Sequence, residues 1–199
     1  MKTNYTEIDI KTIQAWLKEN LNEERYLHSL GAMDSAIYLA KKFNLNEERA
    51  AIAGLIHDCA KCLPKEELLN LLKNECKNYH PTELLNPKTW HAPVGAYLAE
   101  NKFGITDKEI LSSIRWHTLG KVEMSDFEKI IFIADKIEKN TREPEYRQKI
   151  ETTLEKHNCL NKTLLKCFKL TIKSLMKREL TICQQTIDVY NTLIMQTNN

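Results

Sequence analysis

The sequence predicts an all-α protein built as a helical bundle, and three observations support this. Only five glycines and five prolines occur among the 199 residues, so few positions interrupt a helix. No run of β-branched residues alternates with polar ones, as a half-buried strand would require. Helix starts are also marked: Thr6, Thr106 and Ser125 are each followed three residues later by an acidic residue, the spacing of a capping box.

The expected helices follow one another with short connections, apart from one loop. They cover about residues 7–20, 22–44, 47–61, a short stretch from Pro64, 91–102, 107–118, 126–139, 144–157 and a long final helix from Asn161. Asn22 and Asn46, each followed by two glutamates, are suitable N-caps for the second and third helices. Residues 74–90 are predicted to be mostly loop. The final helix carries an apolar stripe, which we interpret as a packing surface or else as a seam between two copies of the chain.

Length and composition indicate one globular domain covering residues 1–199. A chain of this length with 42% hydrophobic residues can bury a sizeable core. Its net charge of +2 gives no general attraction to nucleic acid or to a membrane surface. No stretch of about 18 apolar residues occurs, and the polar N-terminus does not resemble a secretion signal. We therefore expect no nucleic-acid or membrane partner and a cytoplasmic location.

The six cysteines are expected to be reduced, because a chain of this size with a good core does not need disulfides. Cys59 and Cys62 form a C-x-x-C pair, which suits half of a zinc site or a redox pair. No second C-x-x-C follows, so we interpret both as packing residues on one helix.

Six histidine and aspartate side chains lie in or at the ends of apolar helices. They are His28, His57, Asp58, His91, His117 and Asp135, and they come from five different expected helices. Burying an ionised aspartate without a partner is costly, yet Asp58 ends an apolar segment at residues 50–61 and Asp135 interrupts another at residues 130–137. A single buried histidine is explained by a hydrogen bond, whereas six such groups are explained together by a metal cluster at the centre of the bundle. The other two histidines, His80 and His157, are expected to be exposed.

The order of these residues resembles the HD superfamily of metal-dependent phosphohydrolases, and more closely its YqeK family. The resemblance rests on Arg25-Tyr26-Leu27-His28-Ser29, Ile56-His57-Asp58-Cys59-Ala60-Lys61, His91-Ala92-Pro93-Val94-Gly95-Ala96, His117-Thr118-Leu119-Gly120 and Ala134-Asp135-Lys136-Ile137 with Arg142. It implies an HD-domain bundle whose metal-binding core covers about residues 22–142, with C-terminal helices at about 144–197 packed on it. The activity that it implies is symmetrical hydrolysis of diadenosine tetraphosphate to two ADP.

The resemblance also implies a role for each metal ligand. One divalent ion would be held by His28, His57, Asp58 and Asp135. A second ion would be held by His91 and His117, with Asp58 as the bridge. A water molecule between two such ions loses its proton near neutral pH, which supplies a hydroxide for attack on an inner phosphorus. Iron is the metal implied first, and manganese, zinc or nickel also suit this donor set better than magnesium.

A polyphosphate substrate needs cations beside the metals. The candidates, all close in sequence to expected ligands, are Lys61, Arg142 and Arg25. Lys61 is also assigned to catalysis with the bridging aspartate, because it would receive the phosphates. Thr118 and Gly120 are expected to shape the pocket.

Two other functions remain open from the sequence. An HD site recognises phosphate more surely than base, so a nucleoside mono- or triphosphate is an alternative substrate. A metal-bearing, nucleotide-binding regulatory module without turnover is the alternative of a different class. The second metal position argues against that module, because a structural site needs one closed shell of ligands. The glycine-tyrosine-proline signature of cyclic-dinucleotide phosphodiesterases is absent.

Overall fold

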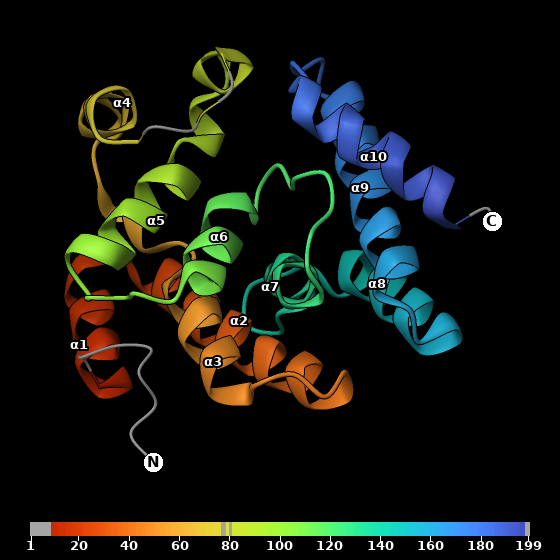
Figure 1. The fold of residues 1–199 in the computed structure, drawn as a ribbon, viewed down its shortest axis with the longest axis horizontal. Coiled ribbons are helices and arrows are strands. Elements are labelled where there is room, and N and C mark those ends of the chain that lie inside the picture. The colour runs from red at the N-terminus through yellow and green to blue at the C-terminus, as the bar shows by residue number, and fades with distance from the viewer. Residues whose placement is uncertain (1–8, 77–78, 80, 198–199) are drawn as a thin grey trace.

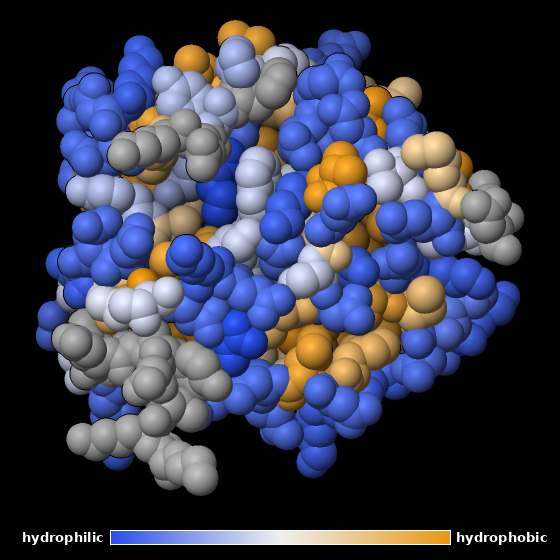
Figure 2. Space-filling view, viewed as in Figure 1, coloured by the Kyte–Doolittle hydropathy of each residue, from blue (hydrophilic) through white to orange (hydrophobic). Residues whose placement is uncertain are grey.

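The computed structural model describes residues 9–76, 79 and 81–197, and within them the regular structure is entirely helical, as predicted (Figure 1). The α-helices are α1 (Ile10–Asn20), α2 (Glu23–Lys42), α3 (Glu47–Ile56), α4 (Lys65–Asn74), α5 (His91–Asn101), α6 (Lys108–Trp116), α7 (Asp126–Ile137), α8 (Pro144–His157), α9 (Leu160–Lys177) and α10 (Gln184–Thr197). Short 3₁₀ helices are η1 (Cys59–Cys62), η2 (Pro81–Leu85) and η3 (Pro87–Thr89). None of the helices in this described part combines the length and apolar character needed to cross a bilayer. Figure 2 shows mainly hydrophilic side chains on one face, with apolar side chains in scattered patches.

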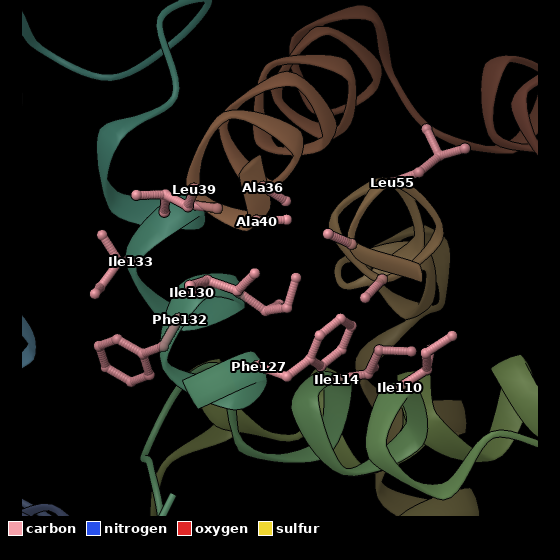
Figure 3. Close-up of a cluster of buried hydrophobic side chains, with 14 of the residues drawn as sticks. Ala36, Leu39, Ala40, Leu55, Ile110, Ile114, Phe127, Ile130, Phe132 and Ile133 are labelled. Atoms are coloured by element: carbon pink, nitrogen blue, oxygen red, sulfur yellow. The ribbon is translucent and has the colours of Figure 1, made fainter. Parts of the chain in front are cut away.

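The apolar core lies where α2, α3, α6 and α7 meet. Figure 3 shows buried side chains of all four helices, among them Ala36 from α2, Leu55 from α3, Ile114 from α6 and Phe127 from α7. Helix α7 is the most buried of them, because residues 130–134 are all inaccessible to solvent. Helices α8 and α9 also pack on α7. This central position carries Asp135, in the last turn of α7, into the interior.

Helices α2 and α3 approach each other unusually closely at Gly54. A Cβ atom at this position would lie 2.8 Å from the backbone oxygen of Ala32 and 3.0 Å from Cα of Met33. Only glycine permits this approach without a shift of backbone. Since α2 carries His28 and α3 leads directly to His57, the contact brings two of the predicted ligands together.

The central helix is buried, as predicted, but it ends earlier than expected. Helix α3 stops at Ile56, and the predicted continuation to Lys61 is wrong, because a turn and η1 follow. The His57 ring explains the early end: its Nδ1 donates to the Gly54 carbonyl at 2.7 Å. A continuing helix would use that carbonyl to bind the amide of Asp58.

Most predicted helix starts are confirmed by side-chain caps. Asn22 and Asn46 accept hydrogen bonds from backbone amides three residues later, and Ser125 forms a complete capping box with Glu128. Thr6 lies outside the described residues, within which Asp9 caps α1.

The prediction that Thr106 is the N-cap of α6 is wrong. Asp107 takes this place and accepts from the amides of Glu109 and Ile110. Its carboxylate is also paired with Arg49, whose Nη2 lies 2.7 Å from Oδ1. A side chain 58 residues earlier therefore selects between two adjacent capping residues.

The prediction of one long final helix from Asn161 is wrong, because this part of the chain forms two helices, α9 and α10. Glu179 has a φ of +53°, and the Leu180 amide bonds back to the Leu175 carbonyl at 3.0 Å. Both features are typical of a helix C-terminus that reverses direction. The chain then places α10 beside α9 (Figure 1). Apolar residues of both helices are thereby buried within the same chain, as the packing interpretation of the stripe requires; pairing with a second copy stays a prediction.

Candidate metal centre

The six predicted histidine and aspartate residues meet at one buried point, although they come from five helices or their ends. His28 lies in α2, His91 is the first residue of α5 and Asp135 lies in α7. His57 and His117 are the C-caps of α3 and α6, and Asp58 follows His57. None of the six is more than 5% exposed. The structure therefore brings together the whole set that the sequence singled out.

The first group of ligand atoms lies around one oxygen of Asp58. The His28 Nε2 atom lies 3.1 Å from both His57 Nε2 and Asp135 Oδ1, and 3.4 Å from Asp58 Oδ2. His57 Nε2 lies 3.6 Å from the same Asp58 oxygen. Two imidazole nitrogens and two carboxylate oxygens thus surround a common point.

The second group lies around the other oxygen of Asp58. The Nε2 atoms of His91 and His117 are 3.1 Å apart, and each lies 3.3 Å from Asp58 Oδ1. The two carboxylate oxygens of Asp58 therefore face different groups of ligands. This is the arrangement that a bridging carboxylate needs.

The imidazole rings are oriented by hydrogen bonds at their Nδ1 atoms. His57 Nδ1 donates to the Gly54 carbonyl and His117 Nδ1 donates to the Ile114 carbonyl, both at 2.7 Å. The two rings thus use the same local device at the ends of α3 and α6. Because the proton sits on Nδ1, the lone pair of Nε2 is directed into the cluster, which is how metal-ligating histidines are usually held.

Burial keeps two of the rings neutral. It lowers the pKa of His57 to about 3 and the pKa of His91 to about 4. A neutral imidazole is the form that binds a metal. Burial opposes ionisation of Asp135, but Lys136, Arg142 and His28 outweigh it and hold its pKa well below the usual range. At neutral pH the neutral nitrogens of His57 and His91 therefore lie in one cluster with the ionised oxygens of Asp135.

This donor set fits divalent cations. Both oxygens of Asp58 are buried, and among the described residues neither receives a hydrogen bond of normal geometry, although Lys61 forms an ion pair with Oδ2. The Nε2 atoms of His28 and His57 face each other at 3.1 Å while both Nδ1 atoms are engaged elsewhere. Two lone pairs at this distance repel, so a proton or a metal ion must lie between them. Neutral imidazoles with carboxylates favour a transition metal.

Glu138 holds His28 in place, a role that was not predicted from the sequence. Its carboxylate is fully buried and accepts from His28 Nδ1 at 3.2 Å, from the Asn140 amide and from Thr141. Gly31 leaves room for it, because a Cβ there would lie 2.5 Å from Glu138 Oε2. Glu138 stands in a polar segment that reads as exposed, so no local signal distinguishes it.

The three cations predicted to bind phosphate all reach the cluster. Lys61 Nζ lies 2.9 Å from Asp58 Oδ2, and Arg25 Nη1 lies 3.7 Å from the same oxygen. Arg142 donates to Asp135. Lys136, which the sequence analysis did not select, also contacts Asp135, and its position next to that residue in the chain was the available signal.

The remaining predicted site residues lie farther from the ligand atoms. Thr118 has a buried hydroxyl that forms no hydrogen bond with any residue in the described part of the chain. Gly120 has a φ of +69°, and a Cβ there would lie 2.7 Å from the Phe168 ring in α9. Gly120 therefore makes room for the C-terminal helices, and a role in shaping the substrate pocket stays a prediction for both residues.

The cysteines are free thiols, as predicted. Cys59 is buried beside the Gly95 carbonyl, and burial raises the pKa of its thiol far above neutrality. Such a thiol is inert, which agrees with a packing role. Of the other histidines, His157 is exposed as predicted and His80 lies outside the described residues.

Residues 25–140 match the family model described as the HD domain. These residues contain all six clustered side chains. The chain therefore belongs to the HD domain family.

The chain is also similar to named members of this family over nearly its whole length. It is 40% identical over 185 residues to the symmetrical bis(5'-nucleosyl)-tetraphosphatase of Bacillus subtilis, covering 90% of this chain and 95% of that protein. The protein of that name from Staphylococcus aureus is 32% identical over 189 residues, with 92% and 94% covered. The crystal structure of a predicted HD superfamily hydrolase "involved in NAD metabolism" from Clostridium acetobutylicum superposes with a TM-score of 0.89 at 38% identity, with 96% and 99% covered. The resemblance to the HD superfamily and its YqeK family is confirmed.

Metal binding is expected to depend on pH through His28. Burial opposes protonation of His28, but hydrogen bonds to Asp135 and Glu138 outweigh it and raise its pKa to about 8. A protonated ring cannot ligate, so the apparent affinity of the metal-free protein for Mn²⁺ should fall about tenfold per pH unit below pH 8 and level off above it. Metal-free folding has the opposite dependence: the stabilisation from protonated His28 is complete below about pH 6.5 and is lost as the pH rises through 8. Chelator competition between pH 6 and 9 measures the affinity.

The variant Glu138→Gln provides the comparison, since it removes one of the interactions that raise the pKa of His28. Its pH midpoint should move from about 8 toward 6.5. Glu145→Gln, which changes an exposed carboxylate in α8, should leave the midpoint in place. An affinity for Mn²⁺ that is constant from pH 6 to 8 would contradict the expected competition.

Proposed function

We propose that this protein is a metal-dependent phosphohydrolase that cleaves diadenosine tetraphosphate symmetrically to two ADP. The observation that carries the proposal is the position of Asp58, whose two oxygens face separate ligand groups 3.3 to 3.6 Å away. The relatives named symmetrical bis(5'-nucleosyl)-tetraphosphatase support this choice of substrate.

Two divalent ions are expected at the cluster, with iron first and manganese, zinc or nickel as alternatives. His28, His57, Asp58 and Asp135 would hold one ion, and Asp58, His91 and His117 would hold the other. Bound there, the ions would lower the pKa of a coordinated water and neutralise charge on the phosphoryl oxygens. The donor set of four imidazoles and two carboxylates supports this metal preference.

The protein's own cations would orient the substrate. Lys61 and Arg25 approach Asp58, while Arg142 approaches Asp135, so positive charge lies beside both carboxylates of the cluster. Such an arrangement suits a chain of four phosphates whose midpoint lies at the reacting position. Water oxygen would bond to one inner phosphorus as the bridge to the other inner phosphorus breaks. Each product is then an ADP.

The test is an assay of purified protein with diadenosine tetraphosphate, ATP and AMP, with metal content determined in parallel. We expect ADP as the sole product from diadenosine tetraphosphate and preference for this substrate over both mononucleotides. If diadenosine tetraphosphate were instead cleaved asymmetrically, to ATP and AMP, symmetrical cleavage would be refuted. Faster turnover of a mononucleotide would support the alternative HD phosphohydrolase, and inertness with supplied Fe²⁺ and Mn²⁺ would support a binding module.

A further inference from the structure

A groove beside the metal cluster is lined by several cations, and one of them, Arg178, is not among the predicted site residues. It lies between the end of α7, the following loop, the start of α8 and one face of α9, and it encloses about 440 Å³. Lys136, Arg142 and Arg178 line it, against a single acid, Glu143. We call it the α9 groove. Its volume lies within the range of small-molecule sites.

The inner end of the α9 groove adjoins the cluster. Lys136 and Arg142 line the groove and also contact the carboxylate of Asp135, which is one of the clustered side chains. The two positive charges of Lys136 and Arg142 exceed the single negative charge of Asp135 that they contact. An anion bound across the cluster would therefore be drawn toward the groove.

The groove continues away from the cluster along α9. Leu170, Ser174 and Arg178 recur at four-residue steps and thus lie on one face of the helix. Leu170 and Arg178 are eight residue steps apart, which corresponds to about 12 Å along the axis. Tyr146, partly buried and hydrogen bonded to Thr171, supplies an aromatic wall. Charge at the inner and outer ends with an aromatic group and hydroxyls between them suits a nucleotide rather than a bare phosphate.

We propose that the α9 groove binds one of the two nucleoside diphosphate halves of the substrate, with Arg178 as a specificity-determining residue. This inference rests on the proposed function, because a symmetrically cleaved dinucleotide must place its two halves on different sides of the reacting phosphorus. Arg178 is exposed, and its Nε donates to the Ser174 carbonyl. A guanidinium group has four further N–H donors that can bind a phosphate.

The variant Arg178→Ala tests the groove, with Lys177→Ala as the matched control one residue earlier on α9 and outside the groove lining. For diadenosine tetraphosphate, we expect Arg178→Ala to raise KM about five- to tenfold, with kcat within about twofold, since an exposed charge-assisted contact is lost. For adenosine 5'-tetraphosphate, whose single adenosine can use the other side, KM should change less than about twofold. Lys177→Ala should match the unchanged protein on both substrates.

Ser174→Tyr provides a second variant that fills the groove without removing a charge, and it should raise KM for the dinucleotide selectively. Equal KM values for Arg178→Ala and Lys177→Ala would overturn the proposal, as would an equal effect of Arg178→Ala on both substrates. Hydrolysis by the unchanged protein tests the proposed function separately. Calorimetry with ADP adds a measurement that needs no turnover. We expect two ADP molecules to bind per chain, and Arg178→Ala should weaken the affinity of one of the two sites. Binding of a single ADP with an affinity unaffected by the substitution would refute the proposed role of the groove.

Discussion

Replacing Asp58 by alanine is expected to abolish hydrolysis, with a loss of about a thousandfold or more in kcat. Both of its oxygens face imidazole groups, so one substitution removes a donor from two ligand groups at once. Metal content should fall with activity. Burial opposes ionisation of Asp58, but His57, Lys61 and the neighbouring imidazoles keep its pKa well below the usual range, so the lost group is a carboxylate at neutral pH. Steady-state rates and elemental analysis of the same samples provide the measurement.

Asp34→Ala is the matched control for this experiment, because Asp34 is an exposed carboxylate on α2, outside the cluster. It should keep its metal and its activity. Circular dichroism of both variants establishes that the helices are retained. If Asp58→Ala kept both activity and bound metal, the bridging role would be refuted.

Gly54→Ala is expected to destabilise the fold by about 2 kcal/mol, although alanine favours helices over glycine. The added Cβ would lie 2.8 Å from the Ala32 carbonyl oxygen, which belongs to rigid helix backbone, so α2 and α3 must separate. For a chain of this length the loss corresponds to a decrease of about 4–8 °C in Tm. Since the two helices carry His28 and lead to His57, metal affinity should fall as well. Thermal denaturation monitored by circular dichroism measures the first effect.

Gly95→Ala is the control, since Gly95 is also a helical glycine near the cluster. Its added Cβ would meet its nearest atoms, the His57 carbonyl oxygen and Ile114 Cγ2, at 3.4 Å, which is ordinary contact. We expect unchanged or slightly higher stability, because the gain in helix propensity is about 1 kcal/mol and little is lost in packing. Similar Tm values for the two alanine variants would show that the α2–α3 contact does not limit stability.

Signals that act within a few residues were sufficient for much of the fold. The caps at Asn22, Asn46 and Ser125 operate across one helical turn, so their patterns located the starts of α2, α3 and α7. The ligand set was also accessible, because a charged or imidazole group inside an apolar segment is costly without a partner. Asp58 and Asp135 are such groups, and both reach the cluster.

Contacts between residues distant in the chain decided the rest. Arg49 selects Asp107 over Thr106 as a cap, and the return of α10 onto α9 ends the helix that local periodicity would have continued. Glu138 is indistinguishable from an exposed glutamate until α2 places His28 and Gly31 against it. Helix starts and buried polar groups follow from local energies, whereas the partner of a charge and the point where a helix turns back depend on which distant surfaces fold together.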